Sequence, residues 1–157
     1  MSKYFQAVLW FALNFLGLYL GSFATTTGIN SPWYTALKQA PWAPPGYIFG
    51  IAWTTIMIAF SIYLFRGWRS VENKRQFALL FGTSWLLNVL WNPIFFVMHQ
   101  TLLGLVVLIA LLLSISAIAV LYRKSQGRYT LLLAPYLIWL VIAASLNAYI
   151  IWQNPIL

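Results

Sequence analysis

The chain has 157 residues, of which 62% are hydrophobic and only 6% charged, so it lacks the polar side chains that would cover a soluble domain. The composition is that of an integral membrane protein. Cysteine is absent and Glu72 is the single acidic residue, which excludes disulfides, thiolate chemistry and carboxylate metal sites. The length leaves no room for a second domain, and we expect residues 1–157 to form one membrane domain.

Five apolar runs follow one another along the chain, and each is long enough to cross a hydrocarbon core of roughly 30 Å as a helix. Their connections are short except for the first, which favours antiparallel neighbours in one bundle. The predicted fold class is therefore an all-α integral membrane protein with five transmembrane helices. The helices are expected at about residues 4–24, 46–65, 76–98, 102–122 and 129–152.

The first apolar run contains two glycines, Gly17 and Gly21, at the spacing that lets membrane helices approach each other closely. Such a pair serves packing within one bundle as readily as contact between two copies of the chain. The sequence therefore leaves a homodimer open.

The long connection before the second run is rich in tryptophan and proline. Three prolines at positions 41, 44 and 45 fix φ and disfavour helix in the preceding residues, which predicts a stiff, extended loop that ends where Gly46 opens the next helix. Aromatic side chains are costly to leave in water, so this loop is expected to cover part of the protein. The expected lid residues are Trp33, Lys38, Pro44 and Pro45.

The basic residues are distributed unevenly. One basic residue, Lys38, lies in the first connection, and none lies in the third connection or near the C-terminus. All the others lie near the N-terminus or in the second and fourth connections. The positive-inside rule then predicts a cytoplasmic N-terminus, with the tryptophan-rich loop and the C-terminus outside, in a bacterial plasma membrane. The formal charge of +8 is thus a topology signal, and no nucleic-acid partner is expected. The cytoplasmic set is Lys3, Arg66, Arg69, Lys74, Arg75, Arg123, Lys124 and Arg128.

Groups for acid–base or nucleophilic catalysis are almost absent, since the chain has no aspartate, no cysteine, one glutamate and one histidine. No ionisable residue lies inside an apolar run, which argues against a proton relay. His99 lies in the turn between the third and fourth runs. It could ligate haem iron, but a histidine in a turn is more often a solvated capping group, so no metal site is predicted.

Aromatic and amide side chains recur at helical spacing on three of the expected helices. One asparagine in a membrane helix usually bonds to a neighbouring helix, and tryptophans near helix ends usually lie at the membrane interface. Together, however, these residues suit an apolar concavity with a few fixed polar groups, as a ligand site requires. The set is Phe49 and Trp53 on the second helix, Asn88, Trp91 and Asn92 on the third, and Trp139, Ala143 and Asn147 on the fifth.

Three segments resemble, in order, the signature blocks of the translocator protein family, also called tryptophan-rich sensory proteins (TspO/MBR). They are WYTALKQAPWAPPGYIFGIAW, NVLWNPIFF and PYLIWLVIAASLN. The resemblance implies a pocket among five helices that the first loop closes, and that binds protoporphyrin, haem and hydrophobic drugs without an obligatory cofactor. The matching ligand positions are Trp42, Pro44, Pro45, Phe49, Trp53, Asn88, Trp91, Trp139, Ala143 and Asn147.

Two departures from the family pattern bear on ligands. The proposed sterol pattern near the end of the fifth helix retains Leu146 and Tyr149, but Gln153 and Asn154 follow in place of a basic residue, so strong cholesterol binding is not expected. At the start of the fourth helix, Leu103 and Val107 stand where many relatives carry an aromatic and an acidic residue. Affinity for synthetic drugs therefore cannot be carried over.

The leading hypothesis is a membrane protein that binds and senses or transports tetrapyrroles, with the lipid bilayer as its other partner. One alternative is an enzyme that degrades porphyrin with light and oxygen, for which the resemblance implicates Trp53 and Trp139. The other is a structural or partner-binding membrane subunit. We expect a binder rather than an enzyme, because stacking explains the tryptophans equally well and no other catalytic group is present.

Overall fold

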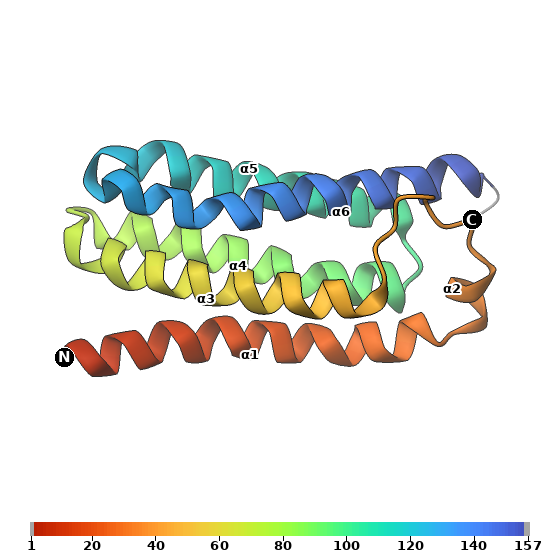
Figure 1. Ribbon diagram of the computed structural model, residues 1–157, viewed down its shortest axis with the longest axis horizontal. Coiled ribbons are helices and arrows are strands. Elements are labelled where there is room, and N and C mark those ends of the chain that lie inside the picture. Colours follow the sequence, from red (N-terminus) through yellow and green to blue (C-terminus); the bar gives the residue numbers. More distant parts are fainter. Residues whose placement is uncertain (1, 156–157) are drawn as a thin grey trace.

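The computed structural model describes residues 2–155. Five long helices lie side by side along one axis (Figure 1), which confirms the prediction of an all-α bundle of five transmembrane helices. The short helix α2 (Pro32–Ala36) and the 3-10 helix η1 (Gly127–Leu133) lie at opposite ends of the bundle. The long helices are α1 (Lys3–Ile29), α3 (Gly46–Ser70), α4 (Lys74–Phe96), α5 (Thr101–Gln126) and α6 (Ala134–Gln153).

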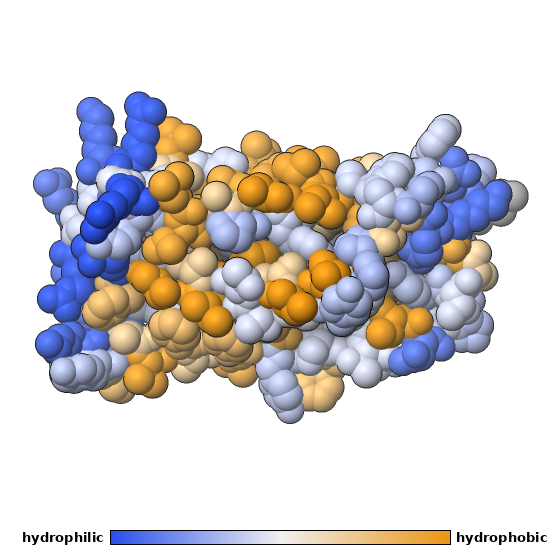
Figure 2. Space-filling view, in the orientation of Figure 1, coloured by the Kyte–Doolittle hydropathy of each residue, from blue (hydrophilic) through white to orange (hydrophobic). Residues whose placement is uncertain are grey.

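The bundle has the surface of a membrane protein. Helices α1, α3 and α4 and the continuous helical stretch Thr101–Gln153 are each long and apolar enough to cross a bilayer. Because η1 reverses the chain between α5 and α6, that last stretch supplies two crossings. Figure 2 shows apolar side chains gathered over the middle of the bundle and hydrophilic ones at both ends. Exposed side chains such as Val8, Leu86 and Val141 therefore face lipid.

The helices close into a ring in the order α1, α3, α6, α5, α4. The pairs α1–α4, α4–α5 and α5–α6 pack along much of their length, whereas α3 and α6 approach each other over only a few residues. Among neighbouring helices of the ring, α3 and α6 thus make the least contact. Gly46 and Gly50, in the first turns of α3, are exposed, and a Cβ atom at either would meet nothing within 4 Å.

The hydrophobic core is concentrated in the half of the bundle nearest η1. There Tyr63, Ile115 and Leu140 are completely buried, and Tyr136 nearly so. A smaller cluster at the opposite end consists of Leu37, Phe95, Phe96 and Ile150, with Trp33 and Tyr34 packed against it. Of the expected site residues, Trp139 belongs to the larger cluster, Phe49 and Trp53 pack against it, and Trp91 packs against both clusters.

The glycines of α1 pack within the bundle. A Cβ atom at Gly17 would lie 2.6 Å from Trp85 Nε1, and one at Gly21 would lie 2.5 Å from Asn92 Nδ2, so only glycine allows α4 this close. The interface is also hydrogen-bonded, since Trp85 Nε1 donates to the carbonyl oxygen of Leu13 at 2.7 Å. Of the two uses left open for this glycine pair, the structure shows the intramolecular one.

The first loop departs from the expected extended form at its start, where α2 forms a single helical turn. Ser31 caps this helix by accepting a hydrogen bond from the Tyr34 backbone N–H at 3.1 Å, and Pro32 occupies its first turn. The rest of the loop is non-helical as far as Pro45, whose ψ is 148°. Helix α3 begins at Gly46, as predicted.

The expected start of the fifth helix at residue 129 is wrong. Gly127, with φ of +53°, ends α5, and the chain then forms η1 before α6 begins at Ala134. Pro135 lacks a backbone N–H and so cannot bond to a carbonyl one turn earlier, which confines it to the first turn of the α-helix. The α-helical segment is shorter than predicted for this reason.

Candidate functional site

The N-terminal half of the tryptophan- and proline-rich loop is tied to the end of the bundle at two points. The Lys38 backbone N–H donates to Asn154 Oδ1 at 3.1 Å, and Asn154 Nδ2 donates back to the Lys38 carbonyl at 3.4 Å. Trp33 stacks on His99, with ring centroids 4.1 Å apart and planes 14° apart. These contacts join the loop to α6 and to the α4–α5 turn. The loop lies across the α6 end of the bundle in Figure 1.

Trp42, at the centre of the loop, lies on the flank of α6. Its Nε1 donates to Ser145 Oγ at 3.2 Å, and its ring meets Tyr149 edge-on at 5.1 Å. Ser145 is two residues from both Ala143 and Asn147, which puts it on nearly the opposite side of α6. With 54% of its surface exposed, Trp42 therefore covers α6 from outside and is not brought together with those two residues.

Aromatic rings from α3 and α6 meet in the loosely packed part of the ring. Phe49 meets Trp139 edge-to-face at 5.1 Å, and Trp53 meets Tyr136 edge-to-face at 5.9 Å. Trp139 is buried, while Phe49 and Trp53 are partly buried. Ala143 is one turn beyond Trp139 on α6 and is also partly buried against the core. The expected stripes on the second and fifth helices thus face each other across one interface.

The α4 residues approach the same region from the far side of the bundle. Trp91 stacks on Phe95 at 5.3 Å, and its buried Nε1 has no hydrogen-bond partner within residues 2–155. Asn88, one turn earlier, is buried, and across the described part of the chain its side-chain amide also makes no hydrogen bond. Two polar groups on one face of α4 are therefore available to something else.

The other two asparagines are used within the protein. Asn92 Oδ1 accepts a hydrogen bond from Thr25 Oγ1 at 2.7 Å, which joins α4 to α1. The Asn147 amide, oriented so that both its groups are satisfied, donates to the Thr101 carbonyl at 2.9 Å and accepts from the Leu105 N–H at 3.2 Å. Asn147 thereby joins α6 to the first turn of α5, and both residues serve as links between helices.

Gly104 on α5 lets two of these residues lie close to the helix backbone. A Cβ atom there would lie 3.1 Å from the Asn147 side-chain amide and 3.5 Å from Trp91 Nε1, the second being an ordinary contact distance. The absence of a side chain at this position therefore makes room chiefly for the Asn147 amide.

The remaining expected residues lie at the loop end. His99 is exposed and has φ of +55°, and one face of its ring is covered by Trp33. Lys38 and Pro45 are exposed, and Pro44 is partly buried. Ligation of haem by His99 stays a prediction.

Sequence analysis missed several residues of this region. Tyr136 packs against Trp53, and Phe95 packs against Trp91. Gly104 lies beside Asn147, and Ser145 accepts a hydrogen bond from Trp42. Tyr136 could have been found, because it precedes Trp139 by three positions on one helix face. Gly104 and Ser145 carry no signal of their own in a single sequence.

Five long apolar helices in a ring, with aromatic side chains of α3 and α6 facing one another under a tethered loop, define a helical membrane protein with a candidate site for a hydrophobic ligand. The model of the TspO/MBR family matches residues 9–153, and the chain belongs to this family. The family resemblance of the sequence is confirmed.

Individual relatives agree. The chain is 38% identical over 137 residues to Protein CrtK of Rhodobacter capsulatus, a match that covers 83% of this chain and 84% of the relative. It is 33% identical over 130 residues to Tryptophan-rich protein TspO of Archaeoglobus fulgidus, covering 82% and 84%. It is 32% identical over 143 residues to the Translocator protein of Bos taurus, covering 88% and 83%.

Proposed function

We propose that this protein binds flat, hydrophobic ligands of the tetrapyrrole class, such as protoporphyrin or haem, between α3, α4 and α6, and acts as a sensor or transporter for them. The names of its relatives, which include a tryptophan-rich sensory protein of Cereibacter sphaeroides and several translocator proteins, support the sensing or transport role. No obligatory cofactor is part of this proposal.

The observation that carries the proposal is the pair of unsatisfied polar groups on α4. A buried polar group without a hydrogen bond costs about 1–3 kcal/mol, so Trp91 Nε1 destabilises the bundle unless it gains a partner. The Asn88 amide, one turn earlier, also makes no hydrogen bond within residues 2–155, but its atoms are not fully enclosed, so its penalty is smaller. Both groups lie beside aromatic rings, where a π-surface would stack. A ligand with a flat apolar body could stack on these rings, and its polar substituents could hydrogen-bond to the two polar groups.

Access to such a site would lead between α3 and α6. The ring contacts between them are edge-to-face, and within residues 2–155 no side-chain hydrogen bond joins them. The loop that covers this end is anchored through Trp33, Lys38 and Trp42. Release of these contacts would let the loop move and a ligand enter between the two helices. Pro44 and Pro45 stiffen the segment between the anchors and α3, which favours movement of the loop as a unit.

We also infer the orientation in the membrane. The N-terminus, the α3–α4 turn and η1 lie together at one end of the bundle, and the loop and α4–α5 turn lie at the other (Figure 1). The first end carries the cluster of basic residues. A cytoplasmic N-terminus and an external loop, in a bacterial plasma membrane, follow from the positive-inside rule.

The binding test is a titration of the purified protein with protoporphyrin, followed by absorption and tryptophan fluorescence. Asn88→Leu and Trp91→Phe each remove one unsatisfied group and should weaken binding several-fold, about 1 kcal/mol each. Trp152→Phe is the matched control, because Trp152 is 73% exposed and contacts only Tyr149 among the rings of the described chain. Equal affinities in all four proteins would place the ligand elsewhere.

A second candidate function is photo-oxidative porphyrin degradation, favoured by the contact of Trp53 with Tyr136, since both rings are oxidisable. Illumination of the bound complex in air separates this function from binding alone. A protein that fails to bind protoporphyrin at all would instead fit the structural or partner-binding alternative.

A further inference from the structure

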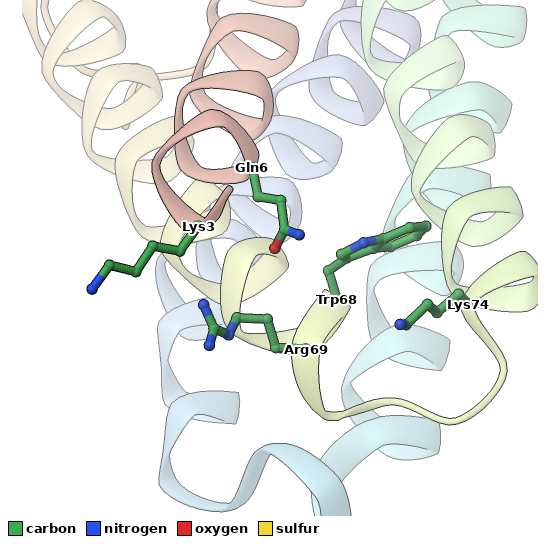
Figure 3. A pocket seen from close by; sticks show the side chains of 5 residues that line it. All are labelled: Lys3, Gln6, Trp68, Arg69 and Lys74. Carbon is green, nitrogen blue, oxygen red and sulfur yellow. The ribbon is translucent and has the colours of Figure 1, made fainter. Parts of the chain in front are cut away.

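A polar cavity of about 510 Å³ lies at the basic end of the bundle, far from the candidate ligand site. It opens between the first turns of α1, the last turns of α3 and the first residue of α4. Figure 3 shows Arg69 extending toward α1, with Trp68 between Arg69 and Lys74. The lining residues are Lys3, Gln6, Trp68, Arg69 and Lys74.

Three cationic side chains therefore line one cavity, and no acidic side chain lines it with them. Glu72, the single acidic residue of the chain, lies in the nearby α3–α4 turn, but no ion pair joins it to Lys3, Arg69 or Lys74 anywhere in residues 2–155. Like charges brought together on separate helices repel one another unless an anion is bound among them. A phosphate group, with several acceptor oxygens, suits one guanidinium and two ammonium groups.

Trp68 fits the position of the cavity at the membrane boundary. It is partly buried, its ring lies 5.7 Å from that of Trp10, and Lys74 Nζ lies 5.9 Å from its centroid. Tryptophan is typical of the headgroup level of a bilayer, where one side of the ring is apolar and the other is wet. The cavity thus lies where lipid headgroups lie, on the side that we assign to the cytoplasm.

An apolar groove of about 410 Å³ runs along α1 from the same region. Lys3, Ala7, Phe11 and Phe15 follow at four-residue spacing, so one stripe of α1 leads from the cavity into the groove. The groove is lined by Ala7, Val8, Phe11, Ala12 and Phe15. Two small alanines among larger side chains leave room for a hydrocarbon chain.

We propose that the basic cavity and the α1 groove form one site for an anionic phospholipid, with the phosphate held by Lys3, Arg69 and Lys74 and one acyl chain lying along Ala7, Phe11 and Phe15. The cytoplasmic leaflet of a membrane supplies such lipids, and basic pockets between transmembrane helices recognise their headgroups. The site is independent of the tetrapyrrole proposal, since it shares no residue with it.

The test compares lipids and matched variants. Native mass spectrometry of the purified protein measures binding of phosphatidylglycerol, phosphatidylcholine and inorganic phosphate. The triple variant Lys3→Gln, Arg69→Gln, Lys74→Gln should lose about tenfold or more in affinity for phosphatidylglycerol. Its control, Arg123→Gln, Lys124→Gln, Arg128→Gln, removes the same charge from the same end of the bundle and should change affinity by less than about twofold.

The variant Ala7→Leu tests the groove, because it fills the space for an acyl chain. It should weaken the binding of phosphatidylglycerol and leave the binding of inorganic phosphate unchanged. Equal losses in the two triple variants would show unspecific charge attraction and overturn the site. Equal affinity for phosphatidylcholine would overturn it too. If inorganic phosphate bound as tightly as phosphatidylglycerol, the site would recognise free phosphate and not a lipid. If the triple variant fails to fold by circular dichroism, Lys3→Gln alone, at the start of α1, decides the question by a loss of about twofold or more.

Discussion

The α1–α4 and α3–α6 interfaces join helices of the same bundle by different means. In α1–α4, glycines allow close backbone approach, and hydrogen bonds from Trp85 and Thr25 are satisfied. In α3–α6, contact is made by the edges of aromatic rings. Across the bundle on α4, Trp91 Nε1 and the Asn88 amide make no hydrogen bond within residues 2–155. The first interface is held by close packing and hydrogen bonds, whereas the second is held by ring contacts.

The largest expected effect is on the α1–α4 interface. Gly21→Leu places a side chain where its Cβ would lie 2.5 Å from Asn92 Nδ2, so it separates the helices and breaks the bond to Thr25. We expect a loss of about 1–3 kcal/mol in stability, measured by thermal unfolding in detergent.

The control is Gly82→Leu in α4, where an added Cβ would meet nothing within 4 Å. It should leave the unfolding temperature nearly unchanged. If Gly21→Leu were equally stable, the interface would be less closely packed than the structure indicates.

On the α3–α6 side we expect a change in binding rather than in folding. Ala143→Leu fills the space beside Trp139 and should weaken protoporphyrin binding about tenfold, about 1.4 kcal/mol, while the unfolding temperature stays close to wild type. Ala148→Leu, on the exposed side of α6, should change neither quantity. Unchanged affinity in Ala143→Leu would move the site away from this helix face.

A smaller effect is expected when Trp53 or Trp139 is replaced by Phe. If the rings only stack on the ligand, each change costs about 1 kcal/mol of binding or less. Illumination of bound protoporphyrin in air then bleaches wild type and variants alike. Bleaching in wild type alone, with a distinct product spectrum, would establish the photo-oxidative function, because phenylalanine is far harder to oxidise than indole.

The smallest effect concerns the loop. Asn154→Ala removes two hydrogen bonds to the Lys38 backbone, each worth about 1 kcal/mol or less at this exposed position. We expect faster hydrogen exchange of the Lys38 amide and faster protoporphyrin release, with little change in overall stability. Gln153→Ala is the neighbouring control, and exchange rates equal in both variants would show that the loop is held by its aromatic contacts alone.

Much of the fold was predictable because its signals are local. Apolar length marked each crossing, and Pro45 followed by Gly46 marked the start of α3. The prediction of an extended loop overlooked α2, although serine followed by proline is a typical start of a helix. The error at η1 arose because an apolar run continues through residues 129–133, and hydropathy does not distinguish a 3-10 helix from an α-helix.

The candidate site was predictable as a set of residues and not as an arrangement. Asn88 and Asn92 are four positions apart on one helix, yet one lacks a partner and the other bonds to α1. Helical spacing cannot separate them, because the difference lies in the neighbour that each one meets. Trp42 likewise has the right residue type, and only the path of the loop places it outside α6.

Gly104 gives the site an unusual sensitivity to mutation. A methyl group there would lie 3.1 Å from the Asn147 amide, which is hydrogen-bonded to α5, so this amide would have to shift. Glycine and alanine codons differ by a single nucleotide, so the smallest genetic step can move a site residue without altering any aromatic residue. Ligand preference in such a protein can diverge while its tryptophan pattern remains the same.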